Sequence, residues 1–286
     1  MTPPDIRATD APRPAFTVRA LVLDLDGTCI SRGTLLHPRT RDAVRAAAQR
    51  VPVVVATGRM YVSALPWARA LGVREPLVCY QGAVVRSVPE GAGGGGPVLL
   101  YEPLTGDAAM RAIRIARAND WHVHAYENER LLAEHERPEL QLYTEVAGVD
   151  ATIVPDLEPF VREGTPKVVC VIDEPAEVRR CMAVMDAELD GRARVTQSRE
   201  PYVEIISPRV SKASACALVC WRHGASLNEV VAIGDAPNDI ELLDAAGFAV
   251  AVDAGRYPQV LEHVDATCAP PTEGGVADAL EAVGIV

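Results

Sequence analysis

The feature of this chain that most constrains its fold is a set of short apolar runs, each ending in glycine or in polar residues. Three of them have the composition of buried parallel strands, namely VRALVLDL at 18–25, PVVVATGR at 52–59 and PLVCY at 76–80. Stretches typical of helices follow the first two runs, at about 40–50 and 60–71. Strands that alternate with helices predict a doubly wound, Rossmann-like α/β core, in which helices cover both faces of a parallel sheet.

The same alternation returns near the end of the chain, after a long interruption. The late elements are a helix at about 211–223, a strand at 229–235, a helix from Pro237 to near Gly247, a strand at 248–252 and a short helix at 273–283. The intervening segment 83–209 is far too long for one crossover between strands, since a whole βαβ unit takes roughly 30 residues. It predicts an inserted α/β domain that begins with a β-hairpin at 83–102. The core is then discontinuous, made of 17–82 and 210–286, and the Pro- and Ala-rich residues 1–16 are expected to form a disordered leader.

Two carboxylates mark the end of the first strand. Asp24 and Asp26 are two residues apart in the segment Asp24-Leu25-Asp26-Gly27-Thr28, so they share one face of an extended chain. In open α/β sheets, ligands bind beyond the carboxyl ends of the strands. Adjacent carboxylates repel each other unless a cation holds them or one is protonated, and Mg²⁺ prefers such oxygen ligands. The same residues also fit an ordinary turn, because Asp-Gly is a common turn dipeptide.

Three further polar segments lie at comparable positions. They are Thr57-Gly58-Arg59 at the end of the second strand, Lys212 at the start of a late helix, and Gly234-Asp235-Ala236-Pro237-Asn238-Asp239 after a late strand. A threonine hydroxyl and free backbone N–H groups at a strand end can hold phosphate oxygens, and Asp235 at a strand tip can be a further metal ligand. Taken one by one, these segments also fit a strand-to-helix turn, a solvated lysine and a helix cap.

Taken together, the four segments resemble the four motifs of the haloacid dehalogenase superfamily of phosphatases. The motifs occur in the order Asp-x-Asp, Thr, Lys and Gly-Asp-x-x-Asn-Asp. The resemblance covers nearly the whole chain, from about residue 19 to the end. The insertion lies between the threonine and lysine motifs, as in the type-IIB, Cof-like subfamily with its α/β cap. VSKASA at 210–215 and GDAPNDIELL at 234–243 are also similar to that subfamily's pattern. The chain departs from the pattern at Tyr80-Gln81-Gly82-Ala83, where the family often has Glu-Asn-Gly-Ala, and at Val252-Asp253-Ala254, where it often has Gly-Asn-Ala.

The resemblance implies a Mg²⁺-dependent phosphatase that works through an aspartyl-phosphate intermediate. In this reading Asp24 is the nucleophile and Asp26 is the general acid and base. The resemblance places Mg²⁺ on the Asp24 carboxylate, the Asp26 backbone carbonyl and Asp235. The residues expected to bind phosphate or the rest of the substrate are Thr57, Gly58, Arg59, Lys167, Lys212 and Asn238. Of these, Thr57 and Lys212 are also expected to be catalytic. Asn238 and Asp239 are expected to orient other groups. The implied substrate is a small phosphorylated metabolite, such as a sugar phosphate or a cofactor precursor.

Two features of the inserted domain stay open on sequence alone. Lys167 follows Pro166 and precedes the strand VVCVI, where the family places a basic residue that reaches the substrate; an edge lysine on a cap strand fits as well. His122 and His124 share a strand face and could bind a metal. No third ligand is in sight, which favours a partly exposed cap surface instead.

Composition limits the other classes of function. The formal net charge of -11 predicts that the chain does not bind nucleic acid. No run approaches the ~18 apolar residues of a membrane span, and the first residues do not have the pattern of a signal peptide. Seven cysteines at irregular spacings indicate free thiols in a reducing cytoplasm. Nothing in the sequence indicates the oligomeric state, the particular substrate or the role of the glycine-rich turn at 91–96.

Two rival functions fit the sequence less well than a phosphatase does. Phosphomutases of this superfamily usually carry a helical cap after the first motif, whereas here only about a dozen residues separate Gly27 from the first core helix. A non-catalytic phosphate-binding or regulatory module predicts the loss of at least one motif residue. All five are present, namely Asp24, Asp26, Thr57, Lys212 and Asp235.

Overall fold

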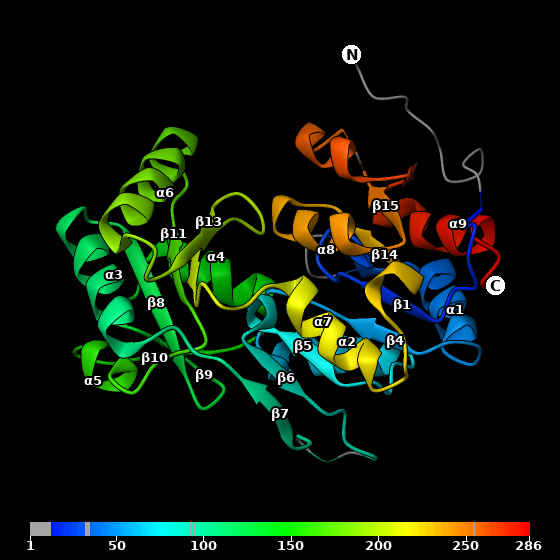
Figure 1. Cartoon of the computed structure of the whole chain (residues 1–286). Helices are drawn as coiled ribbons and strands as arrows, with labels where there is room; N and C mark the ends of the chain where they lie inside the picture. Colours follow the sequence, from blue (N-terminus) through cyan, green and yellow to red (C-terminus); the bar gives the residue numbers. More distant parts are fainter. Residues whose placement is uncertain (1–12, 32–34, 92, 94, 254) are drawn as a thin grey trace.

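A computed structural model describes residues 13–31, 35–91, 93, 95–253 and 255–286 of the chain (Figure 1). Residues 1–12, most of the predicted leader, lie outside the described residues. Within the rest of that segment, Phe16 packs against the buried residues of the core. The packed part of the chain therefore includes at least Phe16.

The core is built on a five-stranded parallel sheet in the order β16-β15-β14-β1-β4. The strands are β1 (Ala20–Leu23), β4 (Val53–Val55), β14 (Val230–Gly234), β15 (Phe248–Val252) and β16 (Ala266–Cys268). Every residue of β1, β4, β14 and β15 is buried, which explains why these strands read as continuous apolar runs. Because β1 pairs with β4 on one side and β14 on the other, early and late segments of the chain form one sheet.

Helices cover both faces of this sheet, so the predicted doubly wound fold is confirmed (Figure 1). On one face lie α1 (Pro38–Ala47), α2 (Tyr61–Ala70) and α9 (Gly275–Ala282). On the other lie α7 (Lys212–Trp221) and α8 (Ile240–Ala245). Between β1 and α1, the short strands β2 (Ile30–Ser31) and β3 (Leu35–Leu36) pair with each other.

The predicted hairpin at 83–102 is present, but it pairs with a strand that lies beside the core sheet. It consists of β6 (Val84–Arg86) and β7 (Val98–Tyr101), and β6 also pairs with β5 (Leu77–Cys79). A parallel bridge between Ala56 and Val78 joins β5 to the edge of the core sheet. Since Val85 is buried among core residues, we propose that the boundary of the inserted domain lies beyond β7 rather than at residue 82.

The inserted domain, here called the cap, has a six-stranded, mostly antiparallel sheet in the order β10-β9-β8-β11-β13-β12. Its strands are β8 (His122–Glu127), β9 (Arg130–Ala133), β10 (Ala151–Ile153), β11 (Val168–Val171), β12 (Arg194–Thr196) and β13 (Tyr202–Ile206). The outer face carries α3 (Gly106–Ala118), α5 (Glu158–Val161) and α6 (Pro175–Leu189), and α4 (Pro138–Ala147) packs with the inner face.

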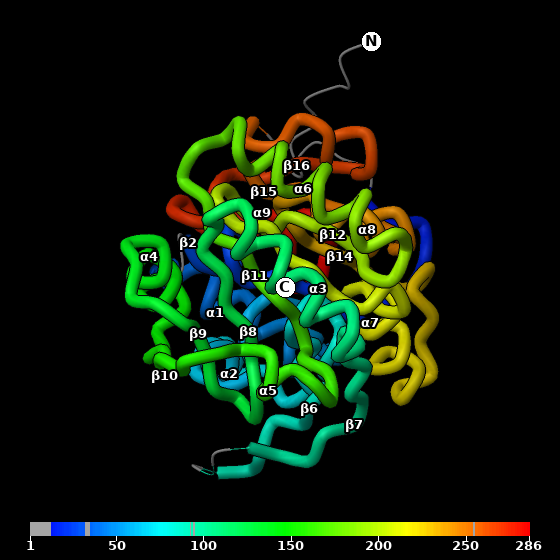
Figure 2. The backbone as a smooth tube through the Cα atoms, turned by 90° about the vertical axis from the view of Figure 1, so that its left-hand side faces the viewer, coloured from blue at the N-terminus to red at the C-terminus, as the bar shows by residue number. Residues whose placement is uncertain are grey.

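The inner face of the cap sheet packs against the core. Alternation along β8 places Val123 and Ala125 among the outer helices, whereas Tyr126 belongs to the buried cluster that contains core strand residues. Tyr202 on β13 belongs to the same cluster. Figure 2 views the molecule from the cap side and shows the cap strands in front of the core. Residues of the cap's inner face are therefore available to a site at the edge of the core sheet.

The prediction of a partly exposed surface at His122 and His124 is wrong, because both side chains are buried. A ring nitrogen of His122 lies 3.2 Å from one of His124, and the other ring nitrogen of His124 lies 3.2 Å from the Tyr126 hydroxyl. The Tyr126 hydroxyl is in turn hydrogen-bonded to that of Tyr143. Within the described part of the chain, no third ligand completes a metal site at these histidines.

These buried histidines predict acid-sensitive folding. Burial lowers the pKa of His122 to about 4, with Arg137 and His135 adding repulsion, and lowers that of His124 well below its usual range. Between about pH 6.5 and pH 4 the unfolded chain therefore binds more protons, so stability falls as the pH drops. We expect His122 alone to cost about 2 kcal/mol between pH 7 and pH 5.

The measurement is urea unfolding at several pH values for the wild type and His122→Gln, whose amide can keep the bond to His124. The variant should lose less stability on acidification. His223→Gln, at an exposed histidine of the core, is the control and should follow the wild type. Parallel pH curves for His122→Gln and the wild type would contradict the prediction.

Candidate active site

The predicted site residues of the core meet where its strands end. Asp24 directly follows β1, Thr57 lies two residues beyond β4, and Asp235 directly follows β14. Because these three strands are parallel neighbours, their carboxyl ends share one edge of the sheet. The chain segments that separate these residues in sequence are thus brought together by strand pairing alone.

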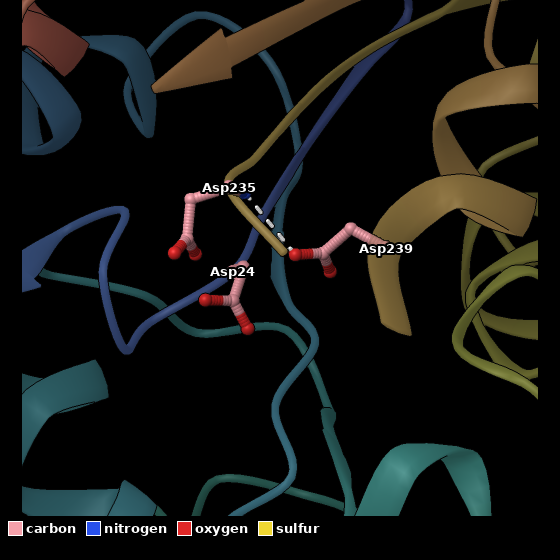
Figure 3. A group of neighbouring side chains, drawn as sticks. All are labelled: Asp24, Asp235 and Asp239. Atoms are coloured by element: carbon pink, nitrogen blue, oxygen red, sulfur yellow. Dashed lines mark hydrogen bonds between the residues drawn. The ribbon is translucent and has the colours of Figure 1, made fainter. Parts of the chain in front are cut away.

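Three buried carboxylates form a cluster at this edge (Figure 3). Asp24, Asp235 and Asp239 each offer an oxygen, and the three oxygens lie within 4.8 Å of one another. The Asp239 carboxylate accepts hydrogen bonds from the backbone N–H groups of Asp235 at 3.2 Å and Ala236 at 3.3 Å, which fix its orientation. The sequence predicted Asp239 only as an orienting group, yet its side chain is part of the cluster. The carboxylate of Asp26 is not.

Lys212 neutralises part of this cluster. Its Nζ donates to Asp24 Oδ1 at 2.6 Å and to Asp239 Oδ1 at 2.7 Å, and the residue is only 2% exposed. A capping box formed by Ser211 and Ser214 begins α7 at Lys212, which fixes the lysine at the first helical position. The alternative of a solvated surface lysine is therefore wrong.

The charges of the cluster fit a divalent cation. Burial raises the pKa of Asp24 to about 7 against the opposing effect of Lys212, and burial with the nearby Asp24 raises that of Asp235 well above its usual range. Three buried carboxylates share a single ammonium group, so a further cation would relieve their repulsion. The donors are all carboxylate oxygens, the ligands that Mg²⁺ takes in proteins.

Gly27 leaves the space that the Asp235 carboxylate occupies. Its φ is +89°, and a Cβ at this position would lie 2.2 Å from Asp235 Oδ2. Thr28, the next residue, donates from Oγ1 to Asp235 Oδ1 at 3.1 Å. The Asp-Gly-Thr sequence after Asp24 is therefore not only a turn, because it also shapes the surroundings of a carboxylate from a distant strand.

Arg59 connects Asp26 to the cap. Its guanidinium donates to both carboxylate oxygens of Asp26, at 2.7 and 2.8 Å. The same group donates to the carbonyl oxygens of Val146 at 3.1 Å and Ala147 at 3.3 Å, at the end of α4. Thr57 Oγ1 accepts a hydrogen bond from the Arg59 backbone N–H at 3.1 Å. Arg59 thus positions the Asp26 carboxylate and at the same time joins it to the end of α4 in the cap.

A second chain of hydrogen bonds across the interface joins Lys167, Glu204, Gln81 and Asn238. Lys167 Nζ donates to the Gly58 carbonyl at 2.8 Å and is paired with the Glu204 carboxylate. Gln81 donates to the other oxygen of Glu204, and its own carbonyl accepts from Asn238 Nδ2 at 3.0 Å. Since β11 lies inside the cap sheet and Lys167 is buried, the alternative of an edge lysine is wrong.

Lys167 should be more important to stability than an exposed lysine. Lys167→Met leaves the buried Glu204 carboxylate without its cation, so we expect a loss of about 3–5 kcal/mol in the free energy of unfolding. The double variant Lys167→Met/Glu204→Gln should recover most of that loss, because it removes the unpaired charge. Urea unfolding checks both. A double variant no more stable than the single one would show that the ion pair is not the cause.

A cavity of about 50 Å³ lies between the core motifs and the cap. From the core it is lined by Asp24, Asp26, Thr57, Gly58, Arg59 and Asn238, and from the cap by Tyr143, Val146, Ala147, Lys167, Ser198, Arg199, Tyr202 and Glu204. Lys212, Asp235 and Asp239 do not line it but surround Asp24. Sequence reasoning missed all of the cap residues except Lys167. The alternation along β13, which turns Tyr202 and Glu204 to one face, was the available signal.

The core is doubly wound, its strand ends carry a buried carboxylate cluster beside a lysine, and an α/β cap covers the cavity. Together these features define a class of hydrolases. The family model of haloacid dehalogenase-like hydrolases matches residues 21–280. The chain therefore belongs to the haloacid dehalogenase-like hydrolase family, as the four motifs predicted.

Relatives and solved structures extend over almost the whole chain. A phosphoglycolate phosphatase of Archaeoglobus fulgidus is 27% identical over 95% of this chain and 99% of its own length. An HMP-PP phosphatase of Enterobacter is 25% identical over 86% of this chain and 88% of its own. A crystal structure from Thermotoga maritima has a TM-score of 0.76 at 27% identity, covering 93% and 97% of the two chains. A subclass IIB sugar phosphatase shares the fold with a TM-score of 0.80 at 18% identity, covering 94% and 100%.

In the part of the chain that the structure describes, no helix is both long and apolar enough to cross a membrane. All seven cysteines lie in that part and are free.

Proposed function

We propose that this chain is a Mg²⁺-dependent phosphatase that hydrolyses a small phosphorylated metabolite through an aspartyl-phosphate on Asp24. The observation that carries the proposal is the position of the Asp24 carboxylate. It lines the cavity, is bonded to Lys212 at 2.6 Å and lies in a cluster of three buried carboxylates. A nucleophile in such a place has a cation beside it and a cavity in front of it.

In the first step, an Asp24 oxygen attacks phosphorus and the bond from phosphorus to the leaving oxygen breaks, while Asp26 gives that oxygen a proton. In the second step, Asp26 takes a proton from water, which attacks phosphorus and releases phosphate from Asp24. Thr57, the Gly58 amide and Lys212 hold phosphate oxygens. Arg59 keeps the Asp26 carboxylate in place through its two hydrogen bonds.

The Asp24 carboxylate, the Asp26 backbone carbonyl and Asp235 would hold the metal. When bound there, Mg²⁺ supplies positive charge that offsets the charge of the transferring phosphoryl group. Asp239 orients Lys212 by accepting one of its hydrogen bonds, and Asn238 is oriented by Gln81. Asn238 also offers an oxygen that is buried without a hydrogen-bond partner among the described residues, which suits a ligand at this edge of the cavity.

The substrate class is supported by the size of the cavity and by the relatives. A volume of about 50 Å³ favours a leaving group of few atoms. The similar proteins named phosphoglycolate phosphatase and HMP-PP phosphatase act, by their names, on small phosphorylated metabolites. The phosphomutase alternative is disfavoured because only residues 28–37 lie between Gly27 and α1, which leaves no room for a cap domain there.

The test is phosphate release from a panel of small phosphorylated metabolites. Turnover should require Mg²⁺, should stop with EDTA and should resume when Mg²⁺ is restored. Ca²⁺ should substitute poorly, because its larger and looser coordination displaces the nucleophile. Turnover that persists at full rate in EDTA, or no release from any member of the panel, would refute the proposal.

A further inference from the structure

The charges along the cavity are paired with one exception. Three of its carboxylates each bond to a cation, the pairs being Asp24 with Lys212, Asp26 with Arg59, and Glu204 with Lys167. Arg199, which lines the cavity from the cap, has no carboxylate partner among the residues that the structure describes. The cap side of the cavity therefore keeps one positive charge that no carboxylate of the described residues neutralises.

Arg199, whose Nε donates to the Glu200 backbone carbonyl at 3.5 Å, lies over a tyrosine whose phenol oxygen has no hydrogen-bond partner among the described residues. Its guanidinium carbon is 5.3 Å from the centre of the Tyr202 ring, a cation–π distance, and that ring packs against Tyr143. Tyr202 lines the same cavity and is only 4% exposed. Its phenol oxygen is buried and makes no hydrogen bond within the described structure. Buried hydroxyls almost always have a partner, so this one suits a bound ligand.

Tyr202 lines the same cavity as Asp26, the group that serves the leaving oxygen in the proposed reaction. Burial raises the pKa of Tyr202 above its usual range against the effect of Arg199, and the nearby carboxylates of Asp26 and Glu204 raise it further. The phenol therefore stays protonated and can donate a hydrogen bond. Arg199 and Tyr202 line the cavity from the cap, whereas Asp24, Asp26 and Thr57 line it from the core, so the part of a substrate that extends from the phosphoryl group toward the cap meets Arg199 and Tyr202.

We infer that the leaving group of the substrate carries a second anionic group, a carboxylate or a phosphate, that binds the Arg199 guanidinium and accepts a hydrogen bond from Tyr202. This inference rests on the proposed phosphatase function. It narrows the substrate to small phosphate monoesters that carry a second anionic group. The planar guanidinium matches the two oxygens of a carboxylate or a phosphate. The small cavity favours a short spacer between the two anionic groups.

The experiment compares three phosphate monoesters of nearly equal size, so that the charge of the leaving group varies while its shape changes little. They are 2-phosphoglycolate, 2-hydroxyethyl phosphate and phosphoethanolamine, whose free ends are negative, neutral and positive. With Mg²⁺ present, kcat/KM should be at least ~30-fold higher for the anionic ester than for the neutral one, since a charged hydrogen-bonded pair is gained. The cationic ester should be the poorest. Ethane-1,2-diol bisphosphate, as a fourth substrate, distinguishes a phosphate end from a carboxylate end.

The variants assign the preference to these two residues. Arg199→Gln should reduce the ratio of anionic to neutral kcat/KM to within about threefold of unity, mainly through KM. Tyr202→Phe should reduce that ratio about fivefold, as expected for one lost hydrogen bond. Arg180→Gln is the matched control, because Arg180 also lies 5.3 Å from an aromatic ring, that of Trp121, but does not line the cavity. It should keep the wild-type ratio.

The outcomes separate the two proposals. Equal turnover of the neutral and anionic esters, or an unchanged ratio in Arg199→Gln, would overturn the anionic subsite and leave the phosphatase standing. No turnover of any ester would count against the phosphatase. In that case, calorimetric titration of Asp24→Asn with the same esters and Mg²⁺ decides the subsite, which predicts tighter binding of 2-phosphoglycolate than of 2-hydroxyethyl phosphate. Equal affinities would overturn it.

Discussion

Asp24→Asn should lower kcat by at least ~10⁴-fold, because an amide cannot attack phosphorus to form the acyl phosphate. The fold should survive, since asparagine has the shape of aspartate and its amide oxygen can still accept from Lys212. Removing one of three clustered, buried carboxylates also relieves their repulsion when no metal is bound. We therefore expect the thermal melt of Asp24→Asn in metal-free buffer to be no lower than that of the wild type.

Steady-state phosphate release and a thermal melt with and without Mg²⁺ check this prediction. The matched control is Asp265→Asn, at a core aspartate that accepts a hydrogen bond from the Ala249 backbone N–H at 2.8 Å and does not line the cavity. It should keep the wild-type kcat. An Asp24→Asn protein that is folded and within about tenfold of wild-type activity would show that Asp24 is not the nucleophile.

Lys212→Arg should lower kcat by ~10²-fold or more, although the variant keeps the positive charge. Lys212 is a compact cation that donates to Asp24 and Asp239 at once, inside a site where it is almost fully buried. A guanidinium is a wide planar group and needs more room and another angle of approach. It would move Asp24 away from its position at the cavity. Because this loss grows as charge develops in the reaction, KM should change much less than kcat.

The measurement is steady-state kinetics beside a thermal melt. Arg222→Lys, at an exposed arginine just after the other end of α7, is the control for an exchange between the two basic side chains and should leave both kcat and the melt unchanged. Near-wild-type kcat in Lys212→Arg would show that the lysine is incidental. A large loss that comes only with a collapsed melt would assign Lys212 to folding rather than to catalysis.

The core could be predicted from sequence because its signals are local. Buried parallel strands appear as unbroken apolar runs, and β1, β4, β14 and β15 were found for that reason. Two elements show where local signals fail. β16 has the sequence Ala-Thr-Cys, so it does not form an unbroken apolar run as β4 does. The hairpin of β6 and β7 follows the core segment directly, so nothing local distinguishes pairing with β5 from membership of the cap.

The site divides in the same way. The core residues were predictable because each motif ends a strand, and pairing of parallel strands brings strand ends together. The partners of these residues across the interface were not predictable. Gln81 bonds Glu204 of the cap, which lies 123 residues further along the chain, and Arg59 bonds two carbonyl groups at the end of α4. Such contacts depend on how the cap lies on the core, which no local pattern encodes. The buried histidines were missed for the same reason, since their cover comes from outside β8.

The two lysines of this chain make an internal reporter of cap motion. Lys167 and Lys212 are the only lysines in the sequence, and both are buried in ion pairs, so an amine-acylating reagent finds neither of them at the described surface. Lys167 bonds the Gly58 carbonyl across the interface, whereas the partners of Lys212 all belong to the core. Lifting the cap uncovers the first amine and leaves the second protected. The acylation rate of Lys167, read by mass spectrometry with Lys212 as the internal standard for unfolding, therefore measures how often the cavity opens in the wild-type protein, without any substitution in the sequence.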